Sequence, residues 1–412
     1  MKVLVLAVCL LFTYSCVEQS DPLLQTDIVD LVLYEDTVGE SLDVDLTDDK
    51  MVVAANYNGF TVYDISRNSL NNIISIDSVF NNSDMASDMG DNRAQNITIS
   101  ENHEIAFITD IFDRIWLYKF SDNAVQYVDD YLSDCYGGTW LSTAIDDQMG
   151  HINVFNLVKH SSSEDDNGET VGDFDQYSTS IVWKGIYDVG QSDLFPEALA
   201  APSCEFSYNF GILPDAIDFD NGLLAVSNGE LGVKVLKQTS ESLCLDSNNE
   251  QIQEFSPSGD IQSDRIICEQ EFDENYNPGL NGNYEPAGGF FPYVHSSFDL
   301  PGEVNSVMVR NHVVFAGLTT SNGCYMSLLD NNGNLLSKLG IANGYTINNI
   351  SEDNGNLALS AGHDGVLLYR YFGGTNVEFV GQVSTPYSNN VKVDGNNLIV
   401  STEDGLYVYL IK

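Results

Sequence analysis

The chain has few basic residues, and this shortage excludes several kinds of partner. Its 412 residues include 16 Lys and Arg against 61 Asp and Glu, so the formal net charge at pH 7 is −45. A surface this negative repels phosphate backbones and anionic lipid headgroups. The composition therefore excludes nucleic-acid binding and attachment to a membrane through charge.

Long apolar runs are also absent, apart from residues 3–12. This run is too short to cross a bilayer as a helix, but it suits the core of a signal peptide, and a Lys precedes it. Ser15 and Cys16 follow in an order that resembles the lipobox of bacterial lipoproteins, although Thr13 and Tyr14 replace the commoner residues. We expect Cys16 to carry a lipid. The alternative is an ordinary signal peptide cut nearby, which would leave a soluble secreted protein.

The first residues thus divide the chain into three parts. We expect a signal peptide over residues 1–15, a tether over 16–26 and a folded domain over 27–412. The expected location is the cell envelope, lipid-anchored at the outer membrane, with no other membrane contact.

Cysteine is scarce, with seven in the whole chain. Outside the cytoplasm, cysteines that lie close together oxidise. Cys244 and Cys268 flank one long segment and are the expected disulfide, Cys135 and Cys204 are a second candidate pair, and Cys324 is expected to remain as a thiol within a strand. No CxxC or Cys/His cluster is present, which argues against a structural zinc site.

A phrase of two strands joined by a glycine turn recurs along the chain. Residues 51–65, MVVAANYNGFTVYDI, are its clearest copy. β-Branched and aromatic residues around Asn-Gly or Asp-Gly are typical of an antiparallel hairpin. The other copies pair 105–109 with 115–120, 141–145 with 150–155, 224–228 with 232–236, 313–317 with 325–329, 357–361 with 365–369, and 398–402 with 405–409.

Two further short runs accompany most hairpins. Alternating runs precede them at 42–46, 96–99, 216–219, 307–309 and 391–393, and a fourth run follows, as at 73–76 and 377–380. Units of four short strands that repeat about every 40 residues are typical of β-propeller blades. We therefore predict an all-β fold, a single propeller of about seven four-stranded blades, or of six if the unit at 141–155 is an insertion.

The ends of the chain predict how this ring closes. The last unit stops at Lys412 after its third strand, while residues 28–34 form a spare strand ahead of the first unit. Pairing of 28–34 with 406–410 would complete the last blade and remove two exposed sheet edges.

These phrases resemble the LVIVD-repeat β-propellers, a family of exported bacterial proteins that includes many lipoproteins. The resemblance rests on the strand phrases, above all on residues 52–66, and covers about 28–412 apart from the insertions. It implies a propeller fold and carries over no catalytic residues.

Three segments exceed what blade connections need, namely 160–177, 188–213 and 238–301. Long loops on a rigid scaffold often hold the functional site. The last segment contains five aromatic residues that would stack on sugar rings, contact a protein or form a small core of their own. They are Tyr276, Tyr284, Phe290, Phe291 and Tyr293.

A second candidate site lies where the innermost strands would line a central channel. Several of these strands open with an amide or acid side chain, and such oxygen atoms would suit Ca²⁺ if they converge. These residues are Asn96, Asp215, Asn305, Asn348 and Asn389. The alternative is that Asn and Asp merely favour the turns that lead into strands.

No catalytic motif accompanies these residues. The sequence contains no nucleophile elbow, HExxH motif, phosphate-binding loop or dinucleotide fingerprint. The sequence therefore favours a non-enzymatic binding scaffold for a protein or glycan partner. The alternative is a Ca²⁺-dependent hydrolase, similar to the propeller lactonases, with its metal in the channel.

Overall fold

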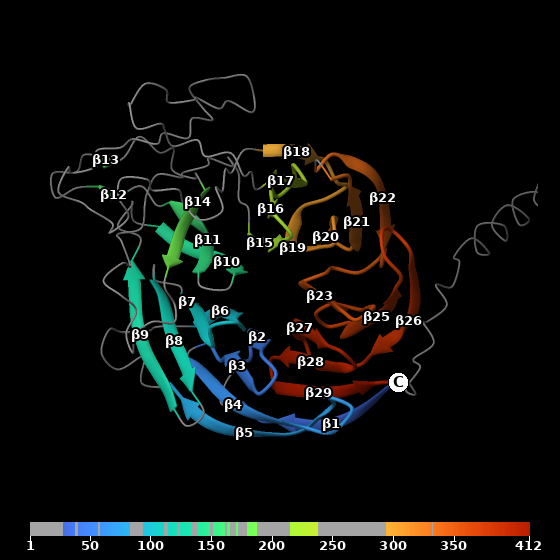
Figure 1. The fold of residues 1–412 in the computed structure, drawn as a ribbon. Helices are drawn as coiled ribbons and strands as arrows, with labels where there is room; N and C mark the ends of the chain where they lie inside the picture. The colour runs from blue at the N-terminus through green and yellow to red at the C-terminus, as the bar shows by residue number, and fades with distance from the viewer. Residues whose placement is uncertain are drawn as a thin grey trace, which may run out of the picture.

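The computed structural model describes residues 28–37, 40–56, 58–82, 94–110, 114–121, 124–132, 138–148, 151–160, 163–164, 170–171, 179–187, 215–237, 294–331 and 333–412. Within these ranges the regular structure is all β, and no helix is long and apolar enough to cross a membrane. Six four-stranded antiparallel sheets and a three-stranded one form a ring (Figure 1), which is the predicted β-propeller.

The strands follow the chain around the ring. Blade 1 contains β2 (Asp43–Leu46), β3 (Lys50–Ala54), β4 (Phe60–Arg67) and β5 (Ile73–Asn81). Blade 2 contains β6 (Ala94–Ser100), β7 (Ile105–Asp110), β8 (Arg114–Ser121) and β9 (Ala124–Leu132). Blade 3 contains β10 (Gly138–Gln148), β11 (His151–His160) and β14 (Thr179–Tyr187), and β12 (Ser163–Glu164) and β13 (Thr170–Val171) form a separate pair.

The second half of the ring repeats this pattern. Blade 4 contains β15 (Ile217–Asp220), β16 (Leu223–Ser227), β17 (Val233–Lys237) and β18 (Val294–Phe298). Blade 5 contains β19 (Val304–Arg310), β20 (Val313–Leu318), β21 (Cys324–Leu329) and β22 (Leu335–Ile341). Blade 6 contains β23 (Asn349–Asp353), β24 (Asn356–Ser360), β25 (Val366–Tyr371) and β26 (Val377–Val383). Blade 7 contains β27 (Ser388–Asp394), β28 (Asn397–Thr402), β29 (Gly405–Ile411) and β1 (Val29–Glu35).

The second strand of each four-stranded blade is buried along its whole length, as the patterns of β3, β7, β16, β20, β24 and β28 show. Each blade packs against a neighbour on both of its faces, so these strands need apolar side chains in both directions. Their sequences are accordingly near-continuous apolar runs rather than alternating ones. The recurring sequence phrase corresponds to these buried second strands and to the third strands that pair with them.

The hydrophobic core consists of clusters that lie between blades. Between blades 1 and 2, the Phe60 and Tyr118 rings meet edge to face with centroids 4.6 Å apart. Between blades 5 and 6, Phe315 and Leu359 belong to one buried cluster. Each junction therefore depends on both neighbouring blades, and the ring is stable as a unit.

Closure of the ring follows the prediction. β1 pairs antiparallel with β29, from Val29 opposite Ile411 to Glu35 opposite Leu406. The N-terminal strand is thus the fourth strand of the last blade. A buried cluster then joins blade 7 to blade 1, in which Ile399 and Val408 pack with strands β2 to β4.

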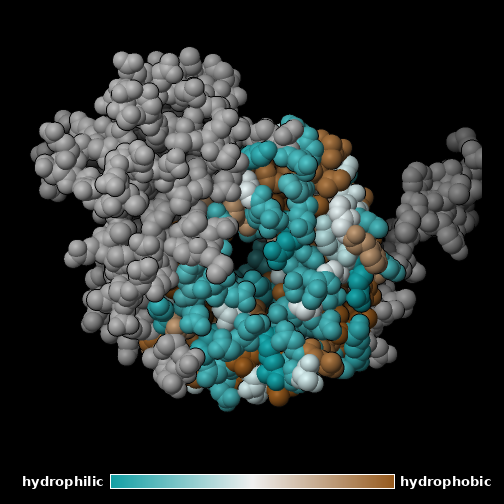
Figure 2. Space-filling view, viewed as in Figure 1, coloured by the Kyte–Doolittle hydropathy of each residue, from teal (hydrophilic) through white to brown (hydrophobic). Residues whose placement is uncertain are grey.

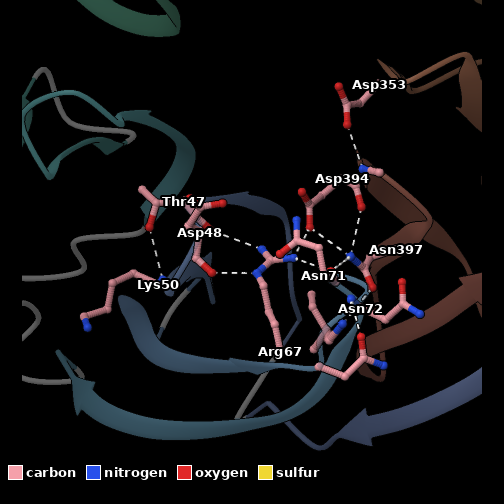
Figure 3. A network of polar contacts seen from close by, with 12 residues as sticks. Thr47, Asp48, Lys50, Arg67, Asn71, Asn72, Asp353, Asp394 and Asn397 are labelled. Atoms are coloured by element: carbon pink, nitrogen blue, oxygen red, sulfur yellow. Dashed lines mark hydrogen bonds and ion pairs between the residues drawn. The ribbon is translucent and has the colours of Figure 1, made fainter.

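A polar network reinforces this junction (Figure 3). The Arg67 guanidinium donates to the backbone carbonyl oxygens of Asp48 at 2.6 Å and Thr47 at 3.2 Å, both in blade 1. It also pairs with the Asp394 carboxylate of blade 7 at 2.5 Å, and the Arg67 side chain is only 10% exposed. From the other side, Asn397 of blade 7 accepts from the Ile73 backbone N–H at 2.8 Å. Side chains from the two ends of the chain therefore hold the first and last blades together.

The structure confirms one expectation about the blade units and corrects another. The unit at 141–155 forms β10 and β11 of blade 3, as the seven-blade prediction requires, and is not an insertion. The insertion predicted at 238–301 is too long at its C-terminal end, because β18 begins at Val294 and pairs with β17. The sequence of β18, VHSSF, lacks the apolar alternation that marks the other strands.

Candidate functional site

The innermost strands of all seven blades line a cavity of about 520 Å³ along the axis of the ring. Figure 2 shows this opening at the centre of one face, surrounded by hydrophilic residues. Each of β2, β6, β10, β15, β19, β23 and β27 contributes residues to the cavity wall. The cavity is polar because these strands alternate apolar and polar side chains.

The structure brings all five predicted channel residues, Asn96, Asp215, Asn305, Asn348 and Asn389, to the wall of this one cavity. Three of them use their amide nitrogen to join neighbouring blades. Asn96 donates to the Leu141 carbonyl at 2.6 Å, and Asn389 donates to the Ser41 carbonyl at 2.8 Å. Asn348 likewise donates to the carbonyl of Ser388 in the next blade, at 3.1 Å. A structural role therefore accounts for an amide at these positions.

The remaining two predicted residues differ from this pattern. The backbone N–H of Asp215 donates to the hydroxyl of Ser227 within the same blade, at 2.8 Å. The side-chain oxygen of Asn305 is buried and has no hydrogen-bond partner. A buried amide oxygen without a partner is costly, so Asn305 is the position of the five that best suits an added ligand.

A second set of channel residues was not recognised from the sequence. The Asp43 and Asp45 carboxylates of blade 1 accept from the backbone N–H groups of Ile97 and Ile99 in blade 2, at 2.7 and 2.8 Å. The innermost strand of a blade has a free edge, and every second N–H on it points away from its own sheet. Acid side chains from the preceding blade satisfy these donors.

The same arrangement recurs at two other junctions. Asp218 of blade 4 accepts from the Val309 N–H at 2.6 Å, and Asp220 accepts from the Asn311 N–H at 2.8 Å. Between blades 6 and 7, Asp353 accepts from the Gly395 N–H at 2.7 Å. The sequence signal is an acid or hydroxyl residue at alternate positions of an innermost strand, as in DVD at 43–45 or DFD at 218–220.

Charges of opposite sign alternate around part of the cavity. Lys392 of blade 7 pairs with Asp45 of blade 1 at 2.5 Å. Arg310 of blade 5 lies 3.6 Å from the Glu352 carboxylate of blade 6. Burial lowers the pKa of Lys392, but the adjacent Asp45 carboxylate outweighs this effect and holds that pKa above its ordinary value. These cations are therefore compensated by neighbouring acids.

Two channel carboxyls are hard to ionise. Burial raises the pKa of Asp43 to about 7, against the opposing effect of the Ile97 N–H, and nearby Asp45 raises it further. Burial also raises the pKa of Asp218 to about 6, while the Val309 N–H and Arg310 lower it. The charge of the channel wall consequently changes between pH 5 and pH 8.

One group of side chains has the composition of a hydrolase triad but not its geometry. The Ser100 hydroxyl lies 3.0 Å from Nδ1 of His103, and Asp147 Oδ1 lies 2.9 Å from the same Nδ1. A catalytic triad requires the serine and the carboxylate on different ring nitrogens, so that the imidazole can remove the hydroxyl proton. The three residues instead join blade 2 to blade 3, since Ser100 also donates to Asp147 at 2.8 Å.

Several predicted sites lie outside the described residues. These are Cys16, the cysteines Cys135, Cys204, Cys244 and Cys268, and the aromatic residues Tyr276, Tyr284, Phe290, Phe291 and Tyr293. Cys324 is described, and it is a buried free thiol in β21, as predicted. Within the described ranges, no group of three or more His, Cys, Asp or Glu side chains is placed to hold a metal ion.

The described residues on either side of 238–293 lie close together, because Leu236 of β17 pairs with Val294 of β18. β17 ends at Lys237, which pairs with Leu223 directly after the turn that follows β15. Lys237 and Val294 therefore lie at the end of blade 4 opposite to the end at which Asn305 and Asn348 open their own strands.

Comparison with known proteins supports the fold alone. No family model matches the chain, and no curated protein matches it. The computationally designed protein Ika8 is similar at 10% identity and a TM-score of 0.50, over 93% of this chain and 100% of that one. The WD40 repeats of RRP9 are similar at 9% identity and a TM-score of 0.51, over 94% and 99%. U3-55K is similar at 9% identity and a TM-score of 0.53, over 94% and 100%.

Proposed function

We propose that this chain is an exported, lipid-anchored scaffold of the cell envelope that binds a protein or glycan partner without catalysing a reaction. The observation that carries the proposal is the use of the channel side chains. A hydrolase site in this channel would need acids or amides that are free to bind a metal ion or a substrate. Here Asn96, Asn389, Asp43 and Asp218 bind backbone groups of neighbouring blades.

The rest of the ring supports the same interpretation. The Ser100, His103 and Asp147 side chains meet at a single imidazole nitrogen, which does not activate a nucleophile. Arg67 and the β1–β29 pairing close the ring at the junction of the two chain ends. A closed ring offers a preorganised framework of blades to a partner, which lowers the conformational entropy lost on binding.

A calcium-dependent hydrolase is the second candidate, and one observation favours it. All five predicted oxygen donors line one cavity, and the Asn305 oxygen among them is buried without a partner. Against it stands the set of five predicted donors, among which only Asp215 has a carboxylate. The other acids of the cavity wall, Asp43, Asp45, Asp218 and Glu352, are engaged by backbone N–H groups or by Arg310. Ca²⁺ sites usually combine several carboxylates with neutral oxygens, so these residues fit the ion poorly.

Thermal melting with calcium and with EDTA separates the two candidates. A ligand that binds only the folded state at 100 times its dissociation constant stabilises it by about 2.7 kcal/mol. The scaffold predicts the same melting temperature with calcium and with EDTA, both for the wild-type chain and for Asn305→Ala. Suppose instead that calcium raises the melting temperature of the wild type and of the matched variant Asn322→Ala but not that of Asn305→Ala. This result would establish the metal site and overturn the scaffold.

The binding partner is tested on the lipidated protein. A glycan array, and photo-crosslinking from the two faces of the ring on intact cells, should give a saturable partner on one face. Turnover of lactone or ester substrates that is lost on Asn305→Ala would contradict the proposal.

A further inference from the structure

Exposed apolar side chains gather on one part of the rim. Among the described residues, six of the twelve large apolar side chains that are exposed lie on β1, on β5 or in the turn before β5. We name this surface the rim patch, and its members are Leu31, Val32, Tyr34, Leu70, Ile74 and Val79. β1 and β5 are the outermost strands of blades 7 and 1, and they lie side by side (Figure 1).

The side chains of the rim patch are largely exposed, and an irregularity in the backbone of β1 contributes to this. Leu33 packs into the cluster between blades 7 and 1, so its neighbours on β1 would be expected to be polar. A register shift between Leu31 and Leu33 places Val32 outward as well. Leu31 is 55% exposed, Ile74 is 55% exposed and Leu70 is 76% exposed. Exposed apolar residues concentrated on two neighbouring strands of an acidic protein are typical of an interaction site.

The sequence led us to expect membrane contact through the lipid anchor alone. We propose that the rim patch adds a second contact, lies against the lipid surface and holds the ring edge-on to the membrane. The proposal rests on the lipid anchor at Cys16 in the proposed function. Eleven residues separate Cys16 from Ile28, and even a fully extended chain of that length spans only about 40 Å. Ile28 leads directly into β1, so the part of the fold nearest to the anchor is the patch itself.

The chemistry of the patch selects the kind of lipid. Tyr34 presents an apolar ring while its hydroxyl donates to the Asp404 carbonyl at 2.8 Å, an arrangement suited to the boundary between acyl chains and water. Asp77 is exposed beside the apolar residues and would repel anionic headgroups, while the exposed Asp30 carboxylate is paired with Lys412. A zwitterionic surface is therefore the expected partner. Both mouths of the channel would then open to the aqueous phase.

The test measures the depth of the patch in the membrane. The lipidated full chain is reconstituted into phosphatidylcholine vesicles that contain brominated acyl chains, which quench tryptophan at short range. Tryptophan is introduced by Leu31→Trp or Ile74→Trp, and by Leu231→Trp as a matched control, because Leu231 is 57% exposed in blade 4, away from the patch. Signals are corrected for the parent chain, which has three Trp.

We expect at least twofold quenching at positions 31 and 74 and none at position 231. Adding Leu31→Asp to the Ile74→Trp chain should abolish the quenching of the tryptophan introduced at position 74, whereas adding Leu231→Asp should not. Including anionic phosphatidylglycerol in the vesicles should weaken the quenching. Flotation with the vesicles reports the anchor separately. A chain that floats without quenching at 31 and 74 would overturn the rim patch but keep the anchor. A chain that does not float would overturn both the rim patch and the anchor. If the chain forms a dimer without lipid and Leu31→Asp dissociates it, the rim patch binds a second copy of this chain instead of the membrane.

Discussion

Removal of the Arg67 side chain should open the ring at one identifiable junction. Arg67→Met keeps most of the apolar stem but deletes four donor contacts, to the carboxylate of Asp394 and to three backbone carbonyls. The Asp394 carboxylate, 23% exposed, would then retain Asn397 as a polar partner but lose its ion pair. Breaking a buried pair by removing one partner costs about 3–5 kcal/mol, and the partial exposure here lowers the expected loss to about 3 kcal/mol.

A double-mutant cycle with Asp394→Asn measures the pair itself. We expect a coupling energy of about 1–3 kcal/mol from urea denaturation of the four proteins, because both side chains belong to one network. Lys412→Met is the matched control. Lys412 also joins the two chain ends, through Asp30 at 2.7 Å, but both side chains are well exposed, so its loss should cost less than about 1 kcal/mol. Equal losses for Arg67→Met and Lys412→Met, or a coupling energy near zero, would refute the role of the network in closure.

Three further predictions concern pH, backbone conformation and export. Because the pKa of Asp43 is raised to about 7 in the folded state, the contribution of Asp43 to the free energy of unfolding should fall as the pH rises from about 4 to about 7. Asp43→Asn should remove this pH dependence. Between pH 4 and pH 7 the free energy of unfolding of the variant should therefore rise by about 2–4 kcal/mol relative to that of the wild type, as measured by denaturation at a series of pH values. Curves of unfolding free energy against pH that run parallel for the two proteins would contradict the prediction. Gly365 has φ +74°, and a Cβ there would lie 2.2 Å from the Val383 carbonyl oxygen, so Gly365→Ala should lower the free energy of unfolding by more than about 2 kcal/mol. Gly373 has φ +96° but open space around it, so Gly373→Ala should lower it by only about 1 kcal/mol. Equal melting temperatures for the two variants would refute this prediction. Cys16→Ala should move the protein from the membrane to the soluble fraction and remove palmitate labelling, and retention at the membrane would show that Cys16 is not the anchor.

The strand phrases were readable from the sequence because burial on both faces demands long apolar runs. β3, β24 and β28 are buried at every position, and their apolar sequences belong to the recurring phrase that predicted the blades. The closing strand β1 was predictable because the last unit of the chain has only three strands and the N-terminal region has one strand too many. Together they make one four-stranded sheet. β18 was missed because VHSSF carries no alternation, and its membership of blade 4 depends on pairing with β17.

The channel was predicted in position but only partly in chemistry. The five residues expected to line it do so, as amides and acids at the start of innermost strands. The second set, with Asp43 and Asp218, was not identified, because an acid in a strand has no local partner to reveal its role. Its backbone donors lie 54 residues away for Asp43 and 91 residues away for Asp218.

The sequence by itself determined the recurring strand pairs, the glycine turns and the strand that closes the ring, because alternation and turn chemistry act over a few neighbouring residues. It left the number of blades at six or seven and did not identify β18. Only the tertiary structure decided what the polar residues of the innermost strands do. Whether Asp43 binds a metal or satisfies the Ile97 N–H depends on which strand lies beside it, and that neighbour exists only once the blades have assembled. The ring therefore follows from local patterns, and the chemistry of its channel follows from the contacts between blades.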